Sequence, residues 1–234
     1  MPGSASASRP ICAQARRAGC RDLVLIGSLV RPNLWTTIPD LGALKTLPEV
    51  LRLYRGGDDH LLSGIARLFE REGFRLVGAH EVAPELLMPE GRLAGPEPDA
   101  DDRDDIAMAR AAIAALGPYD VGQGIVIGRR RIVAVEGAEG TDGMLERCAA
   151  MVASGRIRWG KGVGILVKAP KPQQDRRIDM PAIGPATVDK AAAAGLRGIA
   201  VVAGSTLVVD MDEVVRRADR QGVFVLGVGA EAER

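Results

Sequence analysis

Aromatic residues, cysteine and histidine are scarce in this chain, and each scarcity excludes a class of function. Phe, Trp and Tyr together make up 3% of the 234 residues, which disfavours the aromatic platforms that bind single-stranded nucleic acids. The cysteines Cys12, Cys20 and Cys148 are odd in number and lack CxxC spacing. They therefore predict buried, reduced thiols rather than disulfides or a zinc site. The histidines His60 and His80 are too few for a histidine-rich metal site.

The chain also lacks an excess of charge and a long apolar run. It has 31 Lys and Arg against 30 Asp and Glu, which is untypical of nucleic-acid-binding proteins, so no nucleic acid is expected as a partner. No stretch approaches the ~18 consecutive apolar residues of a membrane helix. Residues 1–10 lack the apolar centre of a secretory signal. We therefore expect a cytoplasmic protein with at most transient membrane contact.

What is present is typical of an α/β protein. Hydrophobic residues make up 47% of the chain, enough for a packed core. Apolar periodicity predicts alternating strands and helices. Strands are expected at Asp22–Gly27, Phe74–Ala79, Val163–Val167, Gly198–Val202, Thr206–Asp210 and Val223–Val228, with a hairpin within Val121–Glu136. Helices are expected at 43–55, 61–72, Ile106–Leu116, Met144–Ala153, Thr187–Ala194 and Met211–Gln221.

Proline and glycine concentrate between Val82 and Asp105, where no periodicity survives. This composition predicts a linker over 84–105 that joins an N-terminal α/β, Rossmann-like domain (1–83) to a C-terminal α/β domain (106–234). The linker ends in an acidic run, with six Asp or Glu residues between Glu97 and Asp105. The run is compatible with a metal site or with the solvated start of the following helix.

The standard catalytic and nucleotide-binding motifs are absent from the sequence. No GxxxxGK[ST] phosphate loop, HExxH zinc motif or GxSxG nucleophile motif occurs. Gly122-Gln123-Gly124 lacks the third glycine of the dinucleotide-binding motif and lies in the expected hairpin. Any site must therefore be assembled from loops at strand ends, where α/β proteins commonly bind ligands.

Two loops carry groups suited to an anionic ligand. Glu139-Gly140-Thr141-Asp142 precedes an expected helix and offers backbone N–H groups and a hydroxyl to a phosphate, although spacing alone favours an ordinary helix cap at Thr141 or Asp142. Lys168 and Lys171 lie three residues apart on a proline-stiffened loop that follows a strand. They predict either a polyphosphate clamp or a solvated basic turn.

A third loop carries an isolated carboxylate. Asp179 lies between apolar residues, after Arg176 and Arg177 and shortly before Pro181. Such a carboxylate can ligate Mg²⁺ or act as a general base, and it can also be a structural partner of the arginines. Together the three loops favour metal-assisted hydrolysis of a phosphoanhydride over redox chemistry.

An ordered set of short motifs resembles the LpxI-type UDP-2,3-diacylglucosamine pyrophosphatases, from about Ile11 to about Gly229. The motifs are Gly27-x-x-x-Arg31-Pro32, Lys45-x-Leu47-Pro48, Gly57-Asp58-Asp59, Gly78-Ala79-His80-Glu81, Gly122-Gln123-Gly124, Glu139-Gly140-Thr141-Asp142, Lys168-Ala169-Pro170-Lys171-Pro172-Gln173 and Asp179-x-Pro181-x-Ile183-Gly184. Each motif is modest alone, but their succession is specific.

The resemblance implies Mg²⁺-dependent hydrolysis of UDP-2,3-diacylglucosamine to UMP and lipid X (2,3-diacylglucosamine 1-phosphate), a step of lipid A biosynthesis on the cytoplasmic side of the inner membrane. It implies two α/β domains with the substrate between them, and a homodimer. It also implies that Asp179 is the catalytic residue, which holds Mg²⁺ or orients water. The implied substrate-binding residues are Gly27, Ser28, Arg31 and Lys45 in the first domain, and Gln123, Glu139, Gly140, Thr141, Asp142, Lys168 and Lys171 in the second.

The chain departs from the family pattern in two respects. The family opens with a strand, a glycine-rich loop and a helix, and nothing in residues 1–10 matches that opening, so the first domain is expected to be incomplete. Ser28 stands where the family usually has Asn, and Asn33 where it usually has Asp. The alternative hypothesis is therefore a shortened, non-catalytic remnant that binds lipid X or a nucleotide sugar.

Overall fold

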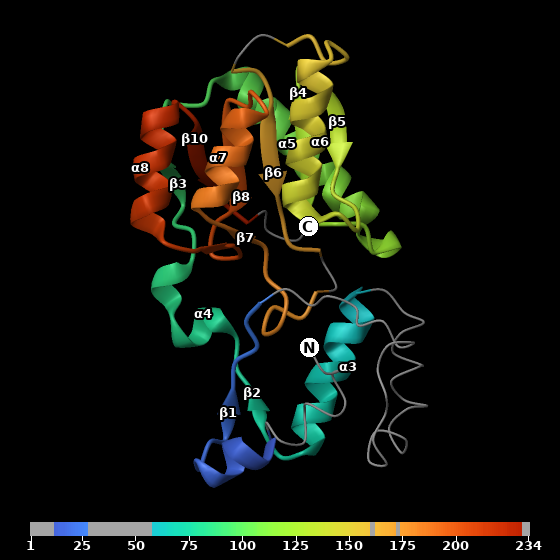
Figure 1. The fold of residues 1–234 in the computed structure, drawn as a ribbon, viewed down its shortest axis with the longest axis vertical. Coiled ribbons are helices and arrows are strands. Elements are labelled where there is room, and N and C mark those ends of the chain that lie inside the picture. The colour runs from blue at the N-terminus through green and yellow to red at the C-terminus, as the bar shows by residue number, and fades with distance from the viewer. Residues whose placement is uncertain (1–11, 28–57, 160–161, 172–173, 231–234) are drawn as a thin grey trace. The chain divides into compact units, whose positions relative to one another are not determined.

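The computed structural model describes residues 12–27, 58–159, 162–171 and 174–230. They divide into two compact units (Figure 1). Unit 1 contains the described residues within Met1–Val82 together with Asp175–Asp179. Unit 2 contains those within Ala83–Gln174 and Met180–Arg234. The chain therefore enters unit 1 a second time, for five residues, and the predicted catalytic Asp179 lies in that short segment rather than in the C-terminal domain.

Unit 1 is built on a small parallel sheet and an amphipathic helix. Its elements are a helical stretch at 12–17, β1 (Asp22–Leu23), α3 (Asp58–Arg71), β2 (Arg75–Leu76) and α4 (Ala79–Val82). Strands β1 and β2 pair in parallel. The core gathers Phe69 of α3, Phe74 and Leu76, and Ile178 of the returning segment packs against it. Burial of Ile178 thus helps to hold residues 175–179 in unit 1.

Unit 2 contains a six-stranded sheet in the order β3-β10-β8-β6-β4-β5. The strands are β3 (Gly91–Ala94), β4 (Gly124–Gly128), β5 (Arg131–Val135), β6 (Ile165–Lys168), β8 (Gly198–Val202) and β10 (Phe224–Val228). The central three, β6, β8 and β10, are parallel, whereas β3, β4 and β5 each pair antiparallel with a neighbour. A parallel centre buried on both faces explains why the central strands are continuous apolar runs.

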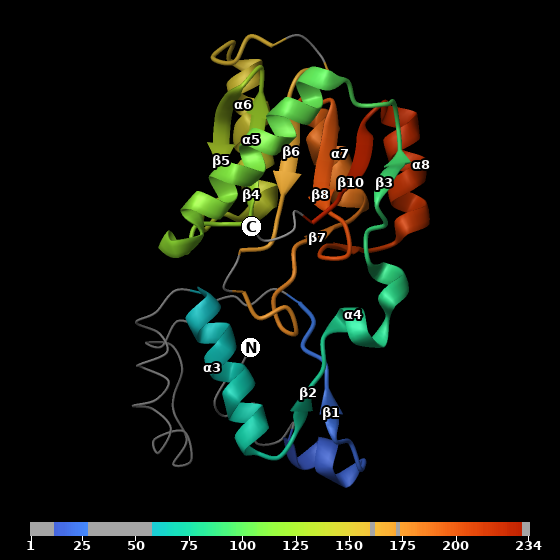
Figure 2. The same cartoon turned by 180° about the vertical axis from the view of Figure 1, so that it is seen from behind.

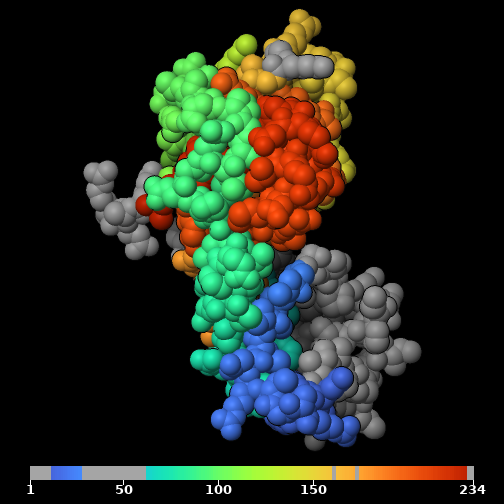
Figure 3. All heavy atoms as spheres, turned by 90° about the vertical axis from the view of Figure 1, so that its left-hand side faces the viewer, coloured from blue at the N-terminus to red at the C-terminus, as the bar shows by residue number. Residues whose placement is uncertain are grey.

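Helices cover both faces of this sheet (Figures 1 and 2). Helix α5 (Ala100–Leu116) lies on one face, and α6 (Gly140–Ala153), α7 (Pro185–Ala193) and α8 (Met211–Gln221) lie on the other. Successive strand residues point to opposite faces, so Leu166 packs in the cluster under α6–α8 while Val167 packs in the cluster under α5. Helix α8 lies beside the edge strand β3, where Asp219 accepts the N–H of Gly95 at 2.8 Å (Figure 3).

Short elements complete unit 2. They are the 3-10 turns η1 (Pro84–Leu86) and η2 (Gly117–Tyr119) and the parallel two-stranded sheet of β7 (Ala182–Ile183) with β9 (Leu207–Val208). No helix among the described residues is long and apolar enough to cross a bilayer. Cys12 and Cys148 are buried as predicted, but Cys20 is exposed, because it follows the turn that ends the first helical stretch.

The predicted linker over 84–105 is wrong. This stretch contains η1, β3 and the first residues of α5, and it belongs to unit 2. Its proline and glycine residues shape short connections around an edge strand of four residues, which is too short to show a period. The boundary between the two units therefore lies between Val82 and Ala83, before the stretch that was predicted to be a linker.

The acidic run is the start of α5, as one of the two interpretations predicted. Asp99 is the N-cap: its carboxylate accepts the Asp102 N–H at 2.9 Å, and the Asp102 carboxylate accepts the Asp99 N–H at 2.9 Å. This reciprocal pair is a capping box. The backbone N–H of Asp102 lowers the pKa of Asp99, whereas burial raises the pKa of Asp102. The helix therefore begins six residues earlier than the predicted Ile106.

The close packing of β10 against the segment before β3 gives a stability prediction. An added Cβ at Gly227 lies 1.9 Å from the carbonyl oxygen of Pro89, which is backbone and cannot move aside cheaply. We expect Gly227→Ala to cost about 3 kcal/mol, which lowers the thermal midpoint by roughly 6–12 °C. The control is Gly229→Ala, whose Cβ meets only the flexible end of Glu90 at 3.1 Å. Equal midpoints for the two variants in thermal unfolding contradict this account of the packing.

Candidate functional site

The carboxyl ends of β6, β8 and β10 share one edge of the sheet in unit 2. Lys168 is the last residue of β6, where it pairs with Val201 of β8 and with Gly124 of β4. Because α/β proteins bind ligands at this edge, the position of Lys168 suits a ligand-binding cation. Its side chain is nevertheless largely withdrawn from water, since the residue is only 7% exposed.

Lys168 is held by a short hydrogen-bonded chain. Its Nζ donates to Thr141 Oγ1 at 2.8 Å and to the carbonyl oxygen of Ala182 at 3.2 Å. The Thr141 hydroxyl in turn donates to Glu136 Oε1 at 2.8 Å. The structure thus brings together the predicted residues Lys168 and Thr141, and it adds Glu136, which the sequence analysis did not single out.

The two glycines of Gly122-Gln123-Gly124 make room for Glu136. An added Cβ at Gly122 lies 2.6 Å from Glu136 Cγ, and one at Gly124 lies 2.6 Å from Glu136 Oε2. The backbone joins the same residues, because Gly122 N–H donates to the Glu136 carbonyl and Glu136 N–H donates to that of Gly124. Steric room for Glu136 therefore explains both glycines of this motif in the β4–β5 hairpin. The predicted site residue Gln123, which lies between them, accepts the Ala169 N–H through its backbone carbonyl at 3.1 Å.

Lys171, the second lysine of the predicted clamp, is committed to a different partner. Its Nζ lies 2.5 Å from Asp120 Oδ1, and its side chain is 5% exposed. Its backbone N–H is accepted by the side chain of Gln174 at 3.0 Å. The described contacts of Lys171 are thus those of a partly buried ion pair, in which the Lys171 side chain is buried and that of Asp120 is half-buried.

The other residues of the Glu139–Asp142 loop lie around the start of α6. Glu139 is exposed and pairs with Arg147 at 2.5 Å, and Asp142 pairs with Lys190 of α7 at 3.1 Å. Gly140 begins the helix with φ +71°, a conformation that favours glycine. Among the predicted residues of this loop, Thr141 is the one whose side chain joins Lys168.

The predicted catalytic residue Asp179 lies in the segment of unit 1 that is fixed by ion pairs. Arg177 donates to both carboxylate oxygens of Asp175 and to Glu70 of α3 at 2.9 Å. The N–H of Asp179 donates to the Asp175 carbonyl at 3.0 Å, which closes a tight turn. Hydrogen bonds from Arg177 lower the pKa of Asp175. The carboxylates of Asp175 and Glu70 in turn raise the pKa of Arg177.

The predicted residues of the first domain are mostly outside the described part. Gly27 is exposed with φ +126°, a backbone conformation that requires glycine. Ser28, Arg31 and Lys45 fall outside the described residues. In the Gly78–Glu81 motif, Glu81 Oε1 accepts the Gly78 N–H at 2.8 Å, and Gly78 lies against the ring of His80, so this motif has a structural explanation.

The donor set around Asp179 can be tested against Mg²⁺. Within the described ranges, no group of three or more His, Cys, Asp or Glu residues is arranged to hold a metal ion. Asp175, the nearest acidic neighbour in the sequence, gives both oxygens to Arg177. Mg²⁺ commonly keeps several waters and is held by one or two carboxylates together with substrate phosphates. A single carboxylate from Asp179 fits a site of that kind and does not fit an all-protein cage.

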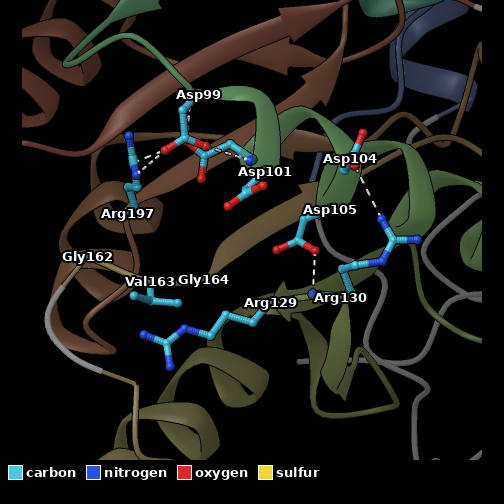
Figure 4. A pocket seen from close by; sticks show the side chains of 11 residues that line it. Asp99, Asp101, Asp104, Asp105, Arg129, Arg130, Gly162, Val163, Gly164 and Arg197 are labelled. Atoms are coloured by element: carbon cyan, nitrogen blue, oxygen red, sulfur yellow. Dashed lines mark hydrogen bonds and ion pairs between the residues drawn. The ribbon is translucent and has the colours of Figure 1, made fainter.

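A pocket of about 350 Å³ lies elsewhere in unit 2, where α5 begins (Figure 4). It is lined by the capped acidic turn, the tip of the β4–β5 hairpin and Arg197, which precedes β8. Asp105 accepts the N–H of Arg130 at 2.6 Å, and Arg197 pairs with Asp99 at 2.7 Å. This pocket is at the amino end of β8, so it is distinct from the edge that carries Lys168.

The turn that carries Asp179 gives a prediction about pH. The pKa of Asp175 in the folded protein is below the unfolded value of about 3.9, so its stabilising contribution is complete above that value and is lost as the pH falls through the folded pKa. We expect Asp175→Asn to cost about 1 kcal/mol at pH 7 and progressively less below pH ~4. Urea unfolding of both proteins between pH 3 and pH 7 measures this. A difference that is constant across the range contradicts the assignment.

Comparisons with known proteins agree with the two-unit structure. Residues 5–86 match the LpxI N-terminal domain family, and residues 89–226 match the LpxI C-terminal domain family. The chain is 44% identical over 213 residues to the UDP-2,3-diacylglucosamine pyrophosphatase LpxI of Caulobacter vibrioides, which covers 91% of this chain and 76% of that protein. The resemblance found in the sequence and the expected two-domain α/β architecture are thereby confirmed, and the chain belongs to the LpxI family.

Proposed function

We propose that this chain hydrolyses UDP-2,3-diacylglucosamine. The observation that carries the proposal is its 44% identity, over 91% of the chain, to a relative named for that activity. In the reaction, the oxygen of water bonds to phosphorus while the bridging P–O bond of the diphosphate breaks. The products are UMP and 2,3-diacylglucosamine 1-phosphate (lipid X), as in lipid A biosynthesis.

The edge that carries Lys168 supports this chemistry. A diphosphate brings negative charge that increases on the leaving group as the bridging bond breaks, and a fixed ammonium group stabilises it. Lys168 is fixed by Thr141 Oγ1 and by the Ala182 carbonyl. The start of α6, from which Thr141 projects, adds the positive end of a helix dipole. We assign diphosphate binding to Lys168 and to the start of α6.

We further propose that Asp179 is the catalytic carboxylate and holds Mg²⁺ together with substrate phosphates. The family resemblance around Asp179 and Pro181 supports this role, and a single carboxylate suits such a site. When bound, Mg²⁺ supplies positive charge against the phosphate oxygens. A carboxylate at Asp179 can also orient a water molecule. The turn closed by the hydrogen bond from its backbone N–H to the Asp175 carbonyl fixes the position of its backbone.

Matches to both LpxI domain families favour this enzyme over the alternative of a non-catalytic remnant. We also propose that the protein is cytoplasmic and contacts the inner membrane transiently, because the proposed substrate is a glycolipid with two acyl chains. We also propose a homodimer, as the family resemblance implies. Sedimentation of the purified protein, alone and with vesicles that contain lipid X, measures both properties.

Replacement of Asp179 tests the catalytic assignment. We expect Asp179→Asn to lower kcat by about 10³-fold, because the neutral amide is a weaker ligand for Mg²⁺ than a carboxylate and cannot accept a proton from water. Release of UMP from UDP-2,3-diacylglucosamine with Mg²⁺ is the measurement. The control is Asp212→Asn, an exposed residue in the first turn of α8. Near-normal turnover by Asp179→Asn rules out the catalytic role, and no UMP release by the unaltered protein rules out the proposed function.

A further inference from the structure

We propose that Glu136 is a positioning residue of this site: its carboxylate fixes the Thr141 hydroxyl, which fixes the Lys168 ammonium group for the diphosphate. The inference rests on the proposed function and adds a residue to it. Glu136 lies just after β5, on a different element from Lys168 on β6 and Thr141 on α6. Its action is therefore transmitted across three elements by two hydrogen bonds.

The direction of these hydrogen bonds is fixed by chemistry. A lysine ammonium group can only donate, so Thr141 Oγ1 is the acceptor in its 2.8 Å contact with Lys168 Nζ. The hydroxyl hydrogen is therefore directed to Glu136 Oε1, also at 2.8 Å. Thr141 thus serves as a relay between an anion and a cation, rather than as a hydrogen-bond donor to the substrate.

The environment of Glu136 is costly for stability alone. Its Oε2 atom is buried and has no hydrogen-bond partner among the described residues. A buried carboxylate oxygen without a donor is unfavourable, and a functional role is one explanation of such a group in proteins. A role in positioning Lys168 provides that explanation. The Thr141 hydroxyl bridges Glu136 and Lys168, so the carboxylate is an anion that compensates the charge of a buried ammonium group.

Gly124 leaves the space that the Glu136 carboxylate occupies. An added Cβ at Gly124 lies 2.6 Å from Glu136 Oε2 and 3.2 Å from Met144 Cε, and both atoms are movable ends of side chains. Gly124 does not have a positive φ, so alanine is compatible with its backbone. Gly124→Ala is thus expected to push the carboxylate aside at small cost to the fold. It tests the position of Glu136 without changing its chemistry.

Steady-state kinetics with UDP-2,3-diacylglucosamine tests the inference. We expect Glu136→Gln, Gly124→Ala and Thr141→Val each to lower kcat by about 10–100-fold and to raise KM by up to about tenfold, because a displaced Lys168 stabilises both the bound diphosphate and the transition state less well. Thr141→Ser keeps the hydroxyl and should retain kcat within about threefold. Glu136→Gln added to Thr141→Val should cause no further loss, since the relay is already broken.

Controls separate positioning from folding. Glu97→Gln makes the same chemical change at an exposed residue near the start of α5 and should leave kcat and KM unchanged. Thermal midpoints of the variants should stay close to that of the parent protein, so that a loss of kcat is not a loss of folded protein. Normal kcat in folded Glu136→Gln and Gly124→Ala variants overturns the inference.

Binding of inorganic diphosphate, measured by calorimetry, distinguishes this failure from failure of the proposed function. If the parent protein releases no UMP, the proposed function is wrong, and the role of Glu136 is then decided by binding alone. Equal weakening of diphosphate binding, by about tenfold, in Glu136→Gln, Gly124→Ala and Thr141→Val supports positioning of Lys168. If the parent releases no UMP and all three variants bind inorganic diphosphate as tightly as the parent does, the positioning role of Glu136 is overturned.

Discussion

The ammonium group of Lys168 is the constraint around which the candidate site of unit 2 is built. At 7% exposure it has lost most of its contact with water, and burial of a charge is tolerated only where partners replace the solvent. Thr141, Glu136 and the Ala182 carbonyl supply those partners from α6, the end of β5 and β7. Four neighbouring elements are therefore tied to the position of one nitrogen atom, including β6, which ends at Lys168.

Much of unit 2 could be predicted because its central strands are buried on both faces. Such strands are continuous apolar runs, and the predictions at Gly198–Val202 and near Val223–Val228 agree with β8 and β10. Edge elements lack that signal. Strand β3 has only four residues, of which Ala94 alone is buried, so it shows no apolar run and its proline- and glycine-rich surroundings resembled a linker. What places β3 in the sheet is its pairing with β10, about 130 residues later in the sequence.

The candidate site was predictable only as far as local spacing reaches. Thr141 and Lys168 were identified as ligand-facing groups at a helix start and a strand end, and the structure joins them at 2.8 Å. Lys171 and Asp142 looked equivalent to them in the sequence, but Asp120 and Lys190 occupy their charges. Glu136 was missed because its position depends on two glycines across a hairpin. The absence of side chains at those glycines was a usable signal, since it leaves a space that a neighbouring strand can fill.

The two groups assigned to catalysis and binding are held by different sets of described contacts. Asp179 lies on a five-residue return of the chain into unit 1, where the partly buried Ile178 packs against the core and Arg177 pairs with Asp175 and Glu70. The described contacts of Lys168 with Thr141 and with the Ala182 carbonyl lie within unit 2. A change at Glu136 or Gly124 therefore alters none of the described contacts that hold the Asp179 turn, and a change at Asp175 alters none of those that hold Lys168. Because these two sets of described contacts share no residue, the effects of such substitutions on the local structure should be additive. A departure from additivity in turnover is then the result expected if both groups bind one substrate, as proposed above.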